Sequence, residues 1–375
     1  MEVIRSDRTT VKPRVIVIYT HFPHYRAPIF DALSRSEAFE YEFFYDQLGT
    51  DATILNAMSR PKHRHLKVKK LGPFMVQLGA LTQACRSDVE AFIFLGNPFI
   101  LTTWIAALIA RFRGVPTLFW THGWLKREKG FKALGRKIFY SISNGLLLYG
   151  NRAQDIGVRS GFKAKNLHVI YNSLNYESQK AIRLTLPKVK KRGATPFFLS
   201  VGRLVKDLEL GLAFDAAHYL SEITECAFEI IVVGDGPLRS QLEEQADRLD
   251  LNVKFMGAVY DEEILGQYFN ECSAVISPGK LGLLAMHALA YGAPVITHGE
   301  LDTQMPEVEA IIEGITGAFF LKGNARDLAV KMAPFLESIR TEAQQRTAID
   351  TVEADYTASI QASRIDHALS KALET

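Results

Sequence analysis

The chain has 375 residues, of which 47% are hydrophobic and 23% charged, and its formal net charge is +3 at pH 7. This length exceeds one ordinary core and suits two domains. The nearly balanced charge argues against a nucleic-acid-binding protein. Cys85, Cys226 and Cys272 are too widely spaced for a disulfide framework or a zinc site, so we expect buried, reduced thiols.

The first residues, MEVIRSDRTTVKPR, are polar and charged and do not resemble a signal peptide. The longest apolar run, around Phe99 to Ile109, is shorter than the roughly 20 residues that span a bilayer. We therefore expect a cytoplasmic protein.

Short apolar strands alternate with helical patterns through the first half of the chain. We expect one helix to begin at Pro28, a favoured first-turn residue, and others near 75–85 and over 102–113. The expected strands are Val15–Tyr19, Phe39–Tyr45, a weaker one at His65–Val68, Ala91–Leu95, Thr117–Trp120, Leu146–Tyr149 and Leu167–Ile170. Strands of this kind between helices predict a parallel sheet that is covered on both faces.

Residues 173–196 are the predicted linker between two domains, because they contain few apolar clusters and the basic run Lys188–Arg192. A long surface loop inside one domain is the alternative. The alternation of strands and helices then restarts. The expected strands are Phe197–Val201, Ile230–Val233, Val253–Phe255, Ala274–Ile276, Pro294–Thr297 and Gly317–Phe320. We predict an α/β protein with doubly wound domains at 1–172 and 197–350 that face a central cleft, and a helix over 351–375 that packs back on them.

The stretch from Ser277 to Thr297 is the most informative about function. It predicts a strand that ends in a Pro-Gly turn, a helix of small residues closed by Gly292, and another buried strand. Ligands of open α/β sheets bind where strand ends meet helix starts. Unpaired backbone N–H groups near Gly282 and Leu283 suit a phosphate, although an ordinary βαβ unit has the same pattern.

Two further strand ends in the second half look suited to phosphate. Gly202 precedes Arg203, which offers a planar fork for two oxygens, and Lys206, which adds a point charge. Gly234 and Gly236 follow the next buried strand. Neither junction matches a dinucleotide fingerprint or a P-loop, and a glycine turn after a strand is more often only structural.

The order of the motifs is more specific than any one of them. VGRLVK, VVGDGPLR, a strand ending in SPG, GLLAMHALAYGAPVITHG and PEVEAIIEGITG together resemble the nucleotide-sugar glycosyltransferases of the GT-B fold, and especially the retaining glycosyltransferase family 4. HFPHYRAPIFDAL, THGW and LLLYGNRAQDIGVRSGF agree in the first half, so the resemblance covers nearly the whole chain. It implies that the second domain binds a nucleoside diphosphate and that the first receives the acceptor.

The resemblance also implies roles for individual residues. Arg203 and Lys206 would neutralise the diphosphate leaving group without a metal ion. The backbone N–H groups of Gly282 and Leu283 would bind the same phosphates. Glu309 matches a position near the nucleotide, and an ordinary exposed helix carboxylate is the alternative.

The chain departs from the family at three positions. The usual pair of glutamates falls on Gly279 and His287, and the usual second basic residue falls on Leu208. We count Gly279 among the nucleotide-binding residues and expect the His287 imidazole to hydrogen-bond the ribose. A satisfied histidine inside a helix is the alternative. Either Lys206 replaces the missing charge or the diphosphate is held more weakly.

The acceptor side is predicted from two segments of the first half. His122 stands in the motif THGW at the carboxyl end of a strand. In the family a histidine near this place touches the donor sugar or orients the acceptor, and a strand-end histidine without a ligand is the alternative. His21, His24, Tyr25 and Arg26 lie where an acceptor would enter.

The segment Trp124–Phe139 reads WLKREKGFKALGRKIF, in which six cations are opposed only by Glu128. Its apolar residues recur at helical intervals. A basic amphipathic segment suits an anionic membrane surface and would bring the enzyme to a lipid-linked acceptor. A solvated basic helix is the alternative.

We expect a retaining, metal-independent glycosyltransferase of surface polysaccharide biosynthesis, cytoplasmic or peripheral on the cytoplasmic face of a membrane. The nucleotide sugar is its substrate, and we expect no bound cofactor. By family analogy, the acceptor attacks on the face from which the diphosphate leaves. Two other classes stay open. A non-catalytic GT-B protein would bind a nucleotide without turnover, and a sugar-nucleotide epimerase would convert the donor without an acceptor.

Overall fold

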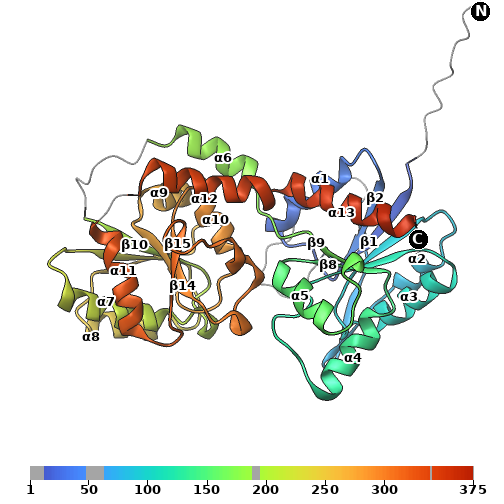
Figure 1. Cartoon of the computed structure of the whole chain (residues 1–375), viewed down its shortest axis with the longest axis horizontal. Coiled ribbons are helices and arrows are strands. Elements are labelled where there is room, and N and C mark those ends of the chain that lie inside the picture. The colour runs from blue at the N-terminus through green and yellow to red at the C-terminus, as the bar shows by residue number, and fades with distance from the viewer. Residues whose placement is uncertain (1–11, 48–62, 188–194, 338–339, 375) are drawn as a thin grey trace, which may run out of the picture.

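The computed structural model describes residues 12–47, 63–187, 195–337 and 340–374. They form two α/β domains, each built on a parallel sheet (Figure 1). The strand order is β3-β2-β1-β6-β7-β8-β9 in the first sheet and β12-β11-β10-β13-β14-β15 in the second. In both sheets the chain starts in the middle, runs to one edge and then crosses to the other, which is the doubly wound Rossmann order. The predicted pair of doubly wound domains is confirmed.

The first sheet is covered on both faces, as its continuous apolar strands require. Its strands are β1 (Arg14–Ile18), β2 (Glu40–Tyr45), β3 (His63–His65), β6 (Ala91–Leu95), β7 (Thr117–Thr121), β8 (Gly145–Leu148) and β9 (Leu167–Val169). Its helices are η1 (His24–Arg26), α1 (Ala27–Ser34), α2 (Ala80–Ala84), α3 (Leu101–Phe112), α4 (Gly130–Tyr140) and α5 (Asn151–Arg159). Alternate residues of β1 enter opposite clusters, so Val15 packs with α1 while Ile16 packs with α2 and α3.

The second sheet is covered in the same way. Its strands are β10 (Phe197–Val201), β11 (Glu229–Val233), β12 (Val253–Gly257), β13 (Ala274–Ser277), β14 (Val295–His298) and β15 (Gly317–Phe320). Helices α7 (Leu210–Ile223), α8 (Arg239–Arg248) and α11 (Ala325–Glu337) cover one face, and α9 (Glu262–Glu271), α10 (Leu284–Ala290) and α12 (Glu342–Asp355) cover the other.

The helix expected near 75–85 is only partly correct. Residues 68–77 form an antiparallel hairpin of β4 (Val68–Leu71) and β5 (Phe74–Gln77), and only α2 is helical. Gly72, at φ +58°, allows the tight turn. Buried Gln77 anchors the hairpin, because its Nε2 donates to the Tyr19 carbonyl at 2.9 Å. The strand expected at His65–Val68 is split between β3 and β4.

The chain crosses between the domains twice. Helix α6 (Tyr176–Thr185) lies within the predicted linker and packs on α9 and α10, while the basic run Lys188–Arg192 lies outside the described residues. After α12, helix α13 (Ala358–Leu373) returns to the first domain and packs on α1 and β8 (Figure 1).

The structure bears on the predicted absence of a membrane-spanning helix and on the predicted burial of the cysteine thiols. No helix in the described part of the chain is long and apolar enough to cross a membrane. The three thiols are free, and Cys272 is buried as expected. Cys85 is exposed, which corrects the expectation for that residue, because it ends α2 at the domain surface.

Candidate functional site

Three loops of the second domain meet at the carboxyl edge of its sheet, and we call them the strand-end loops. They are residues 202–209 after β10, 234–238 after β11 and 278–283 after β13. Backbone hydrogen bonds join them: Leu204 N donates to Asp235 O at 3.0 Å, and Gly279 N donates to Leu208 O at 3.1 Å. Because β11, β10 and β13 are adjacent strands, the structure brings together the three loops on which the phosphate-binding residues are predicted.

The glycines of the strand-end loops allow backbones to touch where a side chain has no room. A Cβ on Gly279 would lie 2.0 Å from the Asp207 carbonyl oxygen, and one on Gly234 would lie 1.9 Å from Gly202 O. A Cβ on Gly236 would lie 2.5 Å from the loop after β10. These glycines therefore have a packing role. The glutamate that the family has at position 279 does not fit beside this loop.

The strand-end loops carry exposed cations. Arg203 and Lys206 are both exposed on the loop after β10. Leu208, at the place of the family's second basic residue, is 9% exposed and packs in the core, so this position cannot supply a charge. On the neighbouring loop, Lys280 Nζ lies 2.7 Å from Asp207 Oδ2, and this hydrogen bond lowers the pKa of Asp207.

The turn before α10 presents free backbone donors. Within the described residues, the N–H groups of Gly282 and Leu283 donate to no protein acceptor, and a Cβ at Gly282 would meet nothing within 4 Å. Buried Gln304 fixes the turn, because its Oε1 accepts from Leu281 N at 2.8 Å and its Nε2 donates to Gly279 O at 3.2 Å. Sequence reasoning missed Gln304, since a single glutamine so far along the chain gives no local signal.

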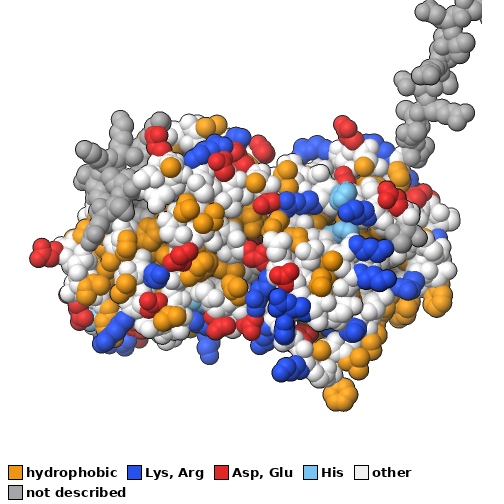
Figure 2. Space-filling model, in the orientation of Figure 1, with side chains coloured by type: hydrophobic (Ala, Val, Ile, Leu, Met, Phe, Trp, Pro, Cys, Tyr) orange, Lys and Arg blue, Asp and Glu red, His pale blue; other side chains and the backbone are white. Residues whose placement is uncertain are grey.

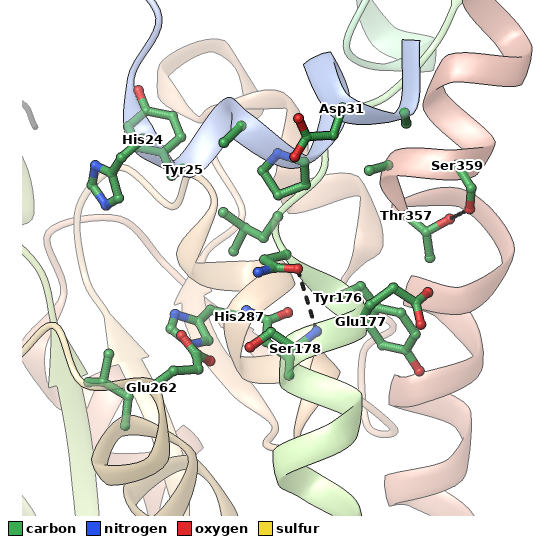
Figure 3. Close-up of a pocket in the computed structure, with 18 of the residues that line it drawn as sticks. His24, Tyr25, Asp31, Tyr176, Glu177, Ser178, Glu262, His287, Thr357 and Ser359 are labelled. Carbon is green, nitrogen blue, oxygen red and sulfur yellow. Dashed lines mark hydrogen bonds and ion pairs between the residues drawn. The ribbon is translucent and has the colours of Figure 1, made fainter. Parts of the chain in front are cut away.

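A cavity of about 660 Å³ lies between the two domains (Figure 3). His24 and Tyr25 line it from the first domain, and Glu262 and His287 line it from the second. The starts of α6 and α13 complete its wall. His21 and the strand-end loops do not line this cavity. Among the residues that the structure describes, no three His, Cys, Asp or Glu side chains are grouped so that they could hold a metal ion.

A carboxylate that the sequence analysis missed holds His287. His287 Nε2 lies 2.8 Å from Glu262 Oε1, which also accepts from the Tyr291 hydroxyl at 2.9 Å. Burial alone would raise the pKa of Glu262, but these hydrogen bonds outweigh burial and lower it. The predicted contact of His287 with a ribose stays a prediction, and its Nε2 is engaged by Glu262 here.

Glu309, in η5 (Pro306–Ala310), caps helix α5 across the domain interface. Its carboxylate accepts from Asn151 N at 2.8 Å and from Arg152 N at 2.9 Å. The first N–H groups of a helix have no partner within the helix, and a carboxylate there is favoured by the helix dipole. Glu309 is thus neither an ordinary exposed carboxylate nor free for a ligand. The predicted contact with the nucleotide requires this cap to open.

The carboxyl edge of the first sheet carries Arg26 and His122. The Arg26 Cζ lies 5.8, 5.8 and 5.3 Å from the ring centroids of Tyr19, Trp120 and Tyr149. The exposed His122 packs its ring on Tyr149, with 4.8 Å between centroids. Desolvation by the surrounding protein, helped by the charge of Arg26, lowers the pKa of His122 to about 4. The imidazole is therefore neutral near pH 7 and can both donate and accept a hydrogen bond.

Sequence comparison finds relatives for part of the chain. Residues 183–350 match the family described as Glycosyl transferases group 1, and this segment contains every residue predicted to bind the nucleotide or its diphosphate. A stretch of 115 residues is 28% identical to the GDP-mannose-dependent alpha-(1-6)-phosphatidylinositol dimannoside mannosyltransferase of two Mycobacterium tuberculosis strains. The stretch covers 29% of this chain and 29% of the length of those curated relatives.

Structure comparison covers nearly the whole chain. The lipopolysaccharide outer core galactosyltransferase WaaB in its apo form has a TM-score of 0.70 and 14% identity, over 96% of this chain and 99% of its own. Anabaena Alr3699/HepE in complex with UDP has a TM-score of 0.69 and 16% identity, over 96% of this chain and 100% of its own. A glycosyltransferase from Rickettsia africae ESF-5 has a TM-score of 0.73 and 15% identity, over 98% of this chain and 100% of its own. These similarities confirm the predicted GT-B fold.

Proposed function

We propose that this chain, with its GT-B fold and its group 1 glycosyltransferase segment, transfers a sugar from a nucleotide-diphosphate donor to an acceptor hydroxyl. One observation carries the proposal. Arg203 and Lys206 stand on a loop that is hydrogen-bonded to the turn with the free N–H groups of Gly282 and Leu283. Cations beside backbone donors suit the charge that a diphosphate develops as it leaves.

The proposed reaction proceeds with retention and without a metal ion. The acceptor hydroxyl oxygen forms a bond to the anomeric carbon on the face from which the diphosphate departs. As the bond from that carbon to the phosphate oxygen breaks, this oxygen takes the hydroxyl proton. The carboxylates of Glu262 and Glu309 are engaged by protein donors and position 279 is glycine, so the proposal assigns no covalent nucleophile. Neutral His122 orients the acceptor.

A donor screen tests the proposed function. We expect one nucleotide sugar of a panel with different bases and sugars to raise the melting temperature of the protein, because a ligand that binds only the folded state stabilises it by mass action. The same donor then releases its nucleoside diphosphate when an acceptor is present. No stabilisation by any donor argues against the proposal. If the donor binds but no nucleoside diphosphate is released in the presence of acceptors, the protein is a non-catalytic binding protein. If the donor sugar is converted without an acceptor, the result supports an epimerase.

The first domain carries an exposed apolar surface that favours a lipid-linked acceptor. We call it the α3–α4 surface. It consists of Leu101, Ile105, Leu108 and Phe112 on one side of α3, and Phe131, Leu134 and Ile138 on α4. Phe112 is 89% exposed and Phe131 is 94% exposed, which is unusual for such large apolar side chains. Figure 2 shows hydrophobic side chains at the lower right, where Figure 1 places α3 and α4, with Lys and Arg side chains nearby.

The structure refines the basic segment predicted over Trp124–Phe139. Only Gly130–Tyr140 is helical, and Trp124 is 5% exposed because its ring packs on Tyr140. Glu128 binds Arg136 at 2.6 and 2.9 Å, which removes part of the charge. The other cations, Lys126, Arg127, Lys129, Lys132 and Lys137, are exposed. Apolar side chains surrounded by cations suit an anionic membrane, and they support the proposal that the protein is peripheral. A lipid-linked acceptor in that membrane would fit the proposed role in surface polysaccharide biosynthesis.

Vesicle sedimentation tests the α3–α4 surface. We expect at least about tenfold stronger binding to phosphatidylcholine vesicles that contain phosphatidylglycerol than to pure phosphatidylcholine, since each basic residue near an anionic surface contributes about 1 kcal/mol. Phe131→Ser with Leu134→Ser should abolish the binding. Ile223→Ser, at an exposed apolar position of α7, is the matched control and should bind like the wild type. Equal sedimentation with both vesicles contradicts the proposal.

A further inference from the structure

Arg26 is a partly buried cation that no carboxylate neutralises within the described residues. Its Nη1 donates to the Tyr19 hydroxyl at 3.2 Å. The rings around it, those of Tyr19, Trp120 and Tyr149, are 4%, 0% and 2% exposed, so water does not solvate the charge on that side. A guanidinium stays charged in proteins and has five N–H donors. The hydroxyl groups of the neighbouring tyrosines can accept hydrogen bonds from only some of these five donors.

Two other arginines of the chain show what a carboxylate partner does. Arg136 binds both oxygens of Glu128, and Arg364 binds Asp355. These carboxylates cancel the charge. The aromatic rings around Arg26 orient the guanidinium and attract it, but they carry no net charge that could neutralise it. A guanidinium that is oriented by aromatic rings and has no carboxylate partner among the described residues is a binding group for an anion.

No carboxylate near Arg26 forms an ion pair with it within the described residues. His122 is neutral near pH 7 because its pKa is about 4. Glu307, from the second domain, is 2% exposed, and burial raises its pKa. Its Oε1 accepts from Asn172 Nδ2 at 2.8 Å, while its Oε2 has no hydrogen-bond partner in the described part of the chain. The charge of Arg26 acts on Glu307, yet no ion pair within 4.0 Å joins them.

We propose that Arg26 binds a phosphate group of the acceptor and so selects acceptors that carry one. The inference rests on the proposed function, because it assigns Arg26 to the acceptor side of the same reaction. A planar guanidinium binds two phosphate oxygens at once. The phosphate that links a glycan to a lipid carrier and a phosphate ester on the glycan offer the same chemistry. Arg26 lies in the first domain, so this site is separate from Arg203 and Lys206 on the second.

Methyl phosphate is the probe for the Arg26 site. The full chain is first saturated with the nucleoside diphosphate of its donor, which fills the strand-end loops, and methyl phosphate is then added at constant ionic strength. We expect the wild type to gain thermal stability, and Arg26→Gln to bind methyl phosphate about tenfold more weakly with unchanged nucleotide affinity. Arg26→Lys keeps the positive charge but lacks the planar guanidinium, so its affinity for methyl phosphate should lie between those of the wild type and Arg26→Gln. Arg159→Gln, at an exposed position of α5, should match the wild type.

Acceptor kinetics provide the second readout. In Arg26→Gln, we expect KM to rise about tenfold for acceptors with a phosphate and to stay unchanged for the phosphate-free glycoside. Acceptors that carry the phosphate at the lipid linkage or on a sugar distinguish the two sources.

Two results overturn the inference while the proposed function stands. In one, methyl phosphate stabilises Arg26→Gln as well as the wild type. In the other, Glu307→Gln loses the effect just as Arg26→Gln does, which makes the two side chains an interdomain pair. If no nucleoside diphosphate stabilises the wild type, the result contradicts the proposed function, and the inference about Arg26, which depends on it, is then also contradicted.

Discussion

Replacing Arg203 with alanine is expected to lower kcat/KM for the donor by about 100-fold, which is the typical effect of removing one group that stabilises developing negative charge. Arg203 and Lys206 are exposed on the loop whose backbone is bonded to the Gly279–Lys280 turn. Because the diphosphate gains charge as the sugar leaves, we expect kcat to fall as well as donor affinity. Lys206→Ala should have an effect of the same kind, since Leu208 is buried and cannot substitute for it.

Steady-state release of nucleoside diphosphate measures this prediction. Arg239→Ala is the matched control, because Arg239 also stands beside a strand-end loop but is paired with Glu243 at 2.8 Å. We expect the control to retain most of the activity. If Arg203→Ala keeps kcat/KM within about twofold of the wild type, the diphosphate does not bind at this loop, and the proposed donor site is wrong.

Replacing Gly279 with alanine is expected to lower the free energy of unfolding by about 2 kcal/mol, the usual cost of forcing a methyl group into a filled space. The new Cβ would lie 2.0 Å from the Asp207 carbonyl oxygen, so the two loops must separate. Their separation breaks the hydrogen bonds from Gly279 N to Leu208 O and from Lys280 N to Asp207 O. Donor binding should weaken with it, because the same contact joins the loop that carries Arg203 and Lys206 to the turn before α10.

Gly282→Ala is the control for Gly279→Ala, because a Cβ at Gly282 would meet nothing within 4 Å of it. Its stability should change by less than about 0.5 kcal/mol in thermal or urea unfolding. Gly279→Glu restores the glutamate of the resembled family, and we expect it to lower activity instead of raising it. Equal stabilities of Gly279→Ala and Gly282→Ala would show that the contact between the loops is not needed.

The interdomain contacts suggest which atoms separate when the cleft opens. Glu309 accepts hydrogen bonds from the start of α5, and the Glu307 carboxyl accepts one from Asn172. Both carboxyl groups come from η5 of the second domain, and the donors, on Asn151, Arg152 and Asn172, belong to the last part of the first domain. An opening motion must expose these N–H groups to water or to a ligand.

Local patterns were sufficient to predict most strands of the two parallel sheets and the strand-end loops. Ile230–Val233 is apolar throughout because both faces of its sheet are covered, and β11 spans it. The glycines that end β11 and β13 mark close backbone approaches, although the sequence did not indicate that the approach is between loops. The hairpin at residues 68–77 was missed, because its anchor at Gln77 is a contact with a distant carbonyl.

The burial or the partners of several side chains could not be predicted from the sequence. Trp124 recurs at helical spacing with Phe131, yet it is buried against Tyr140 while Phe131 faces solvent. Glu309 was predicted near a nucleotide, and it caps a helix of the other domain. Glu262, which holds His287, carries no motif at all.

The order of residues along the chain is enough to predict the two Rossmann-like domains and the loops that carry Arg203, Lys206 and Gly282. Periodicity and glycine positions are properties of neighbouring residues, so a local reading finds them. The folded arrangement sets which carboxylates and cations meet: Glu309 caps a helix of the other domain, while Arg26 has no carboxylate partner among the described residues. Partnering depends on groups that lie far apart in the chain and meet only when both sheets are folded and α13 has returned to the first domain.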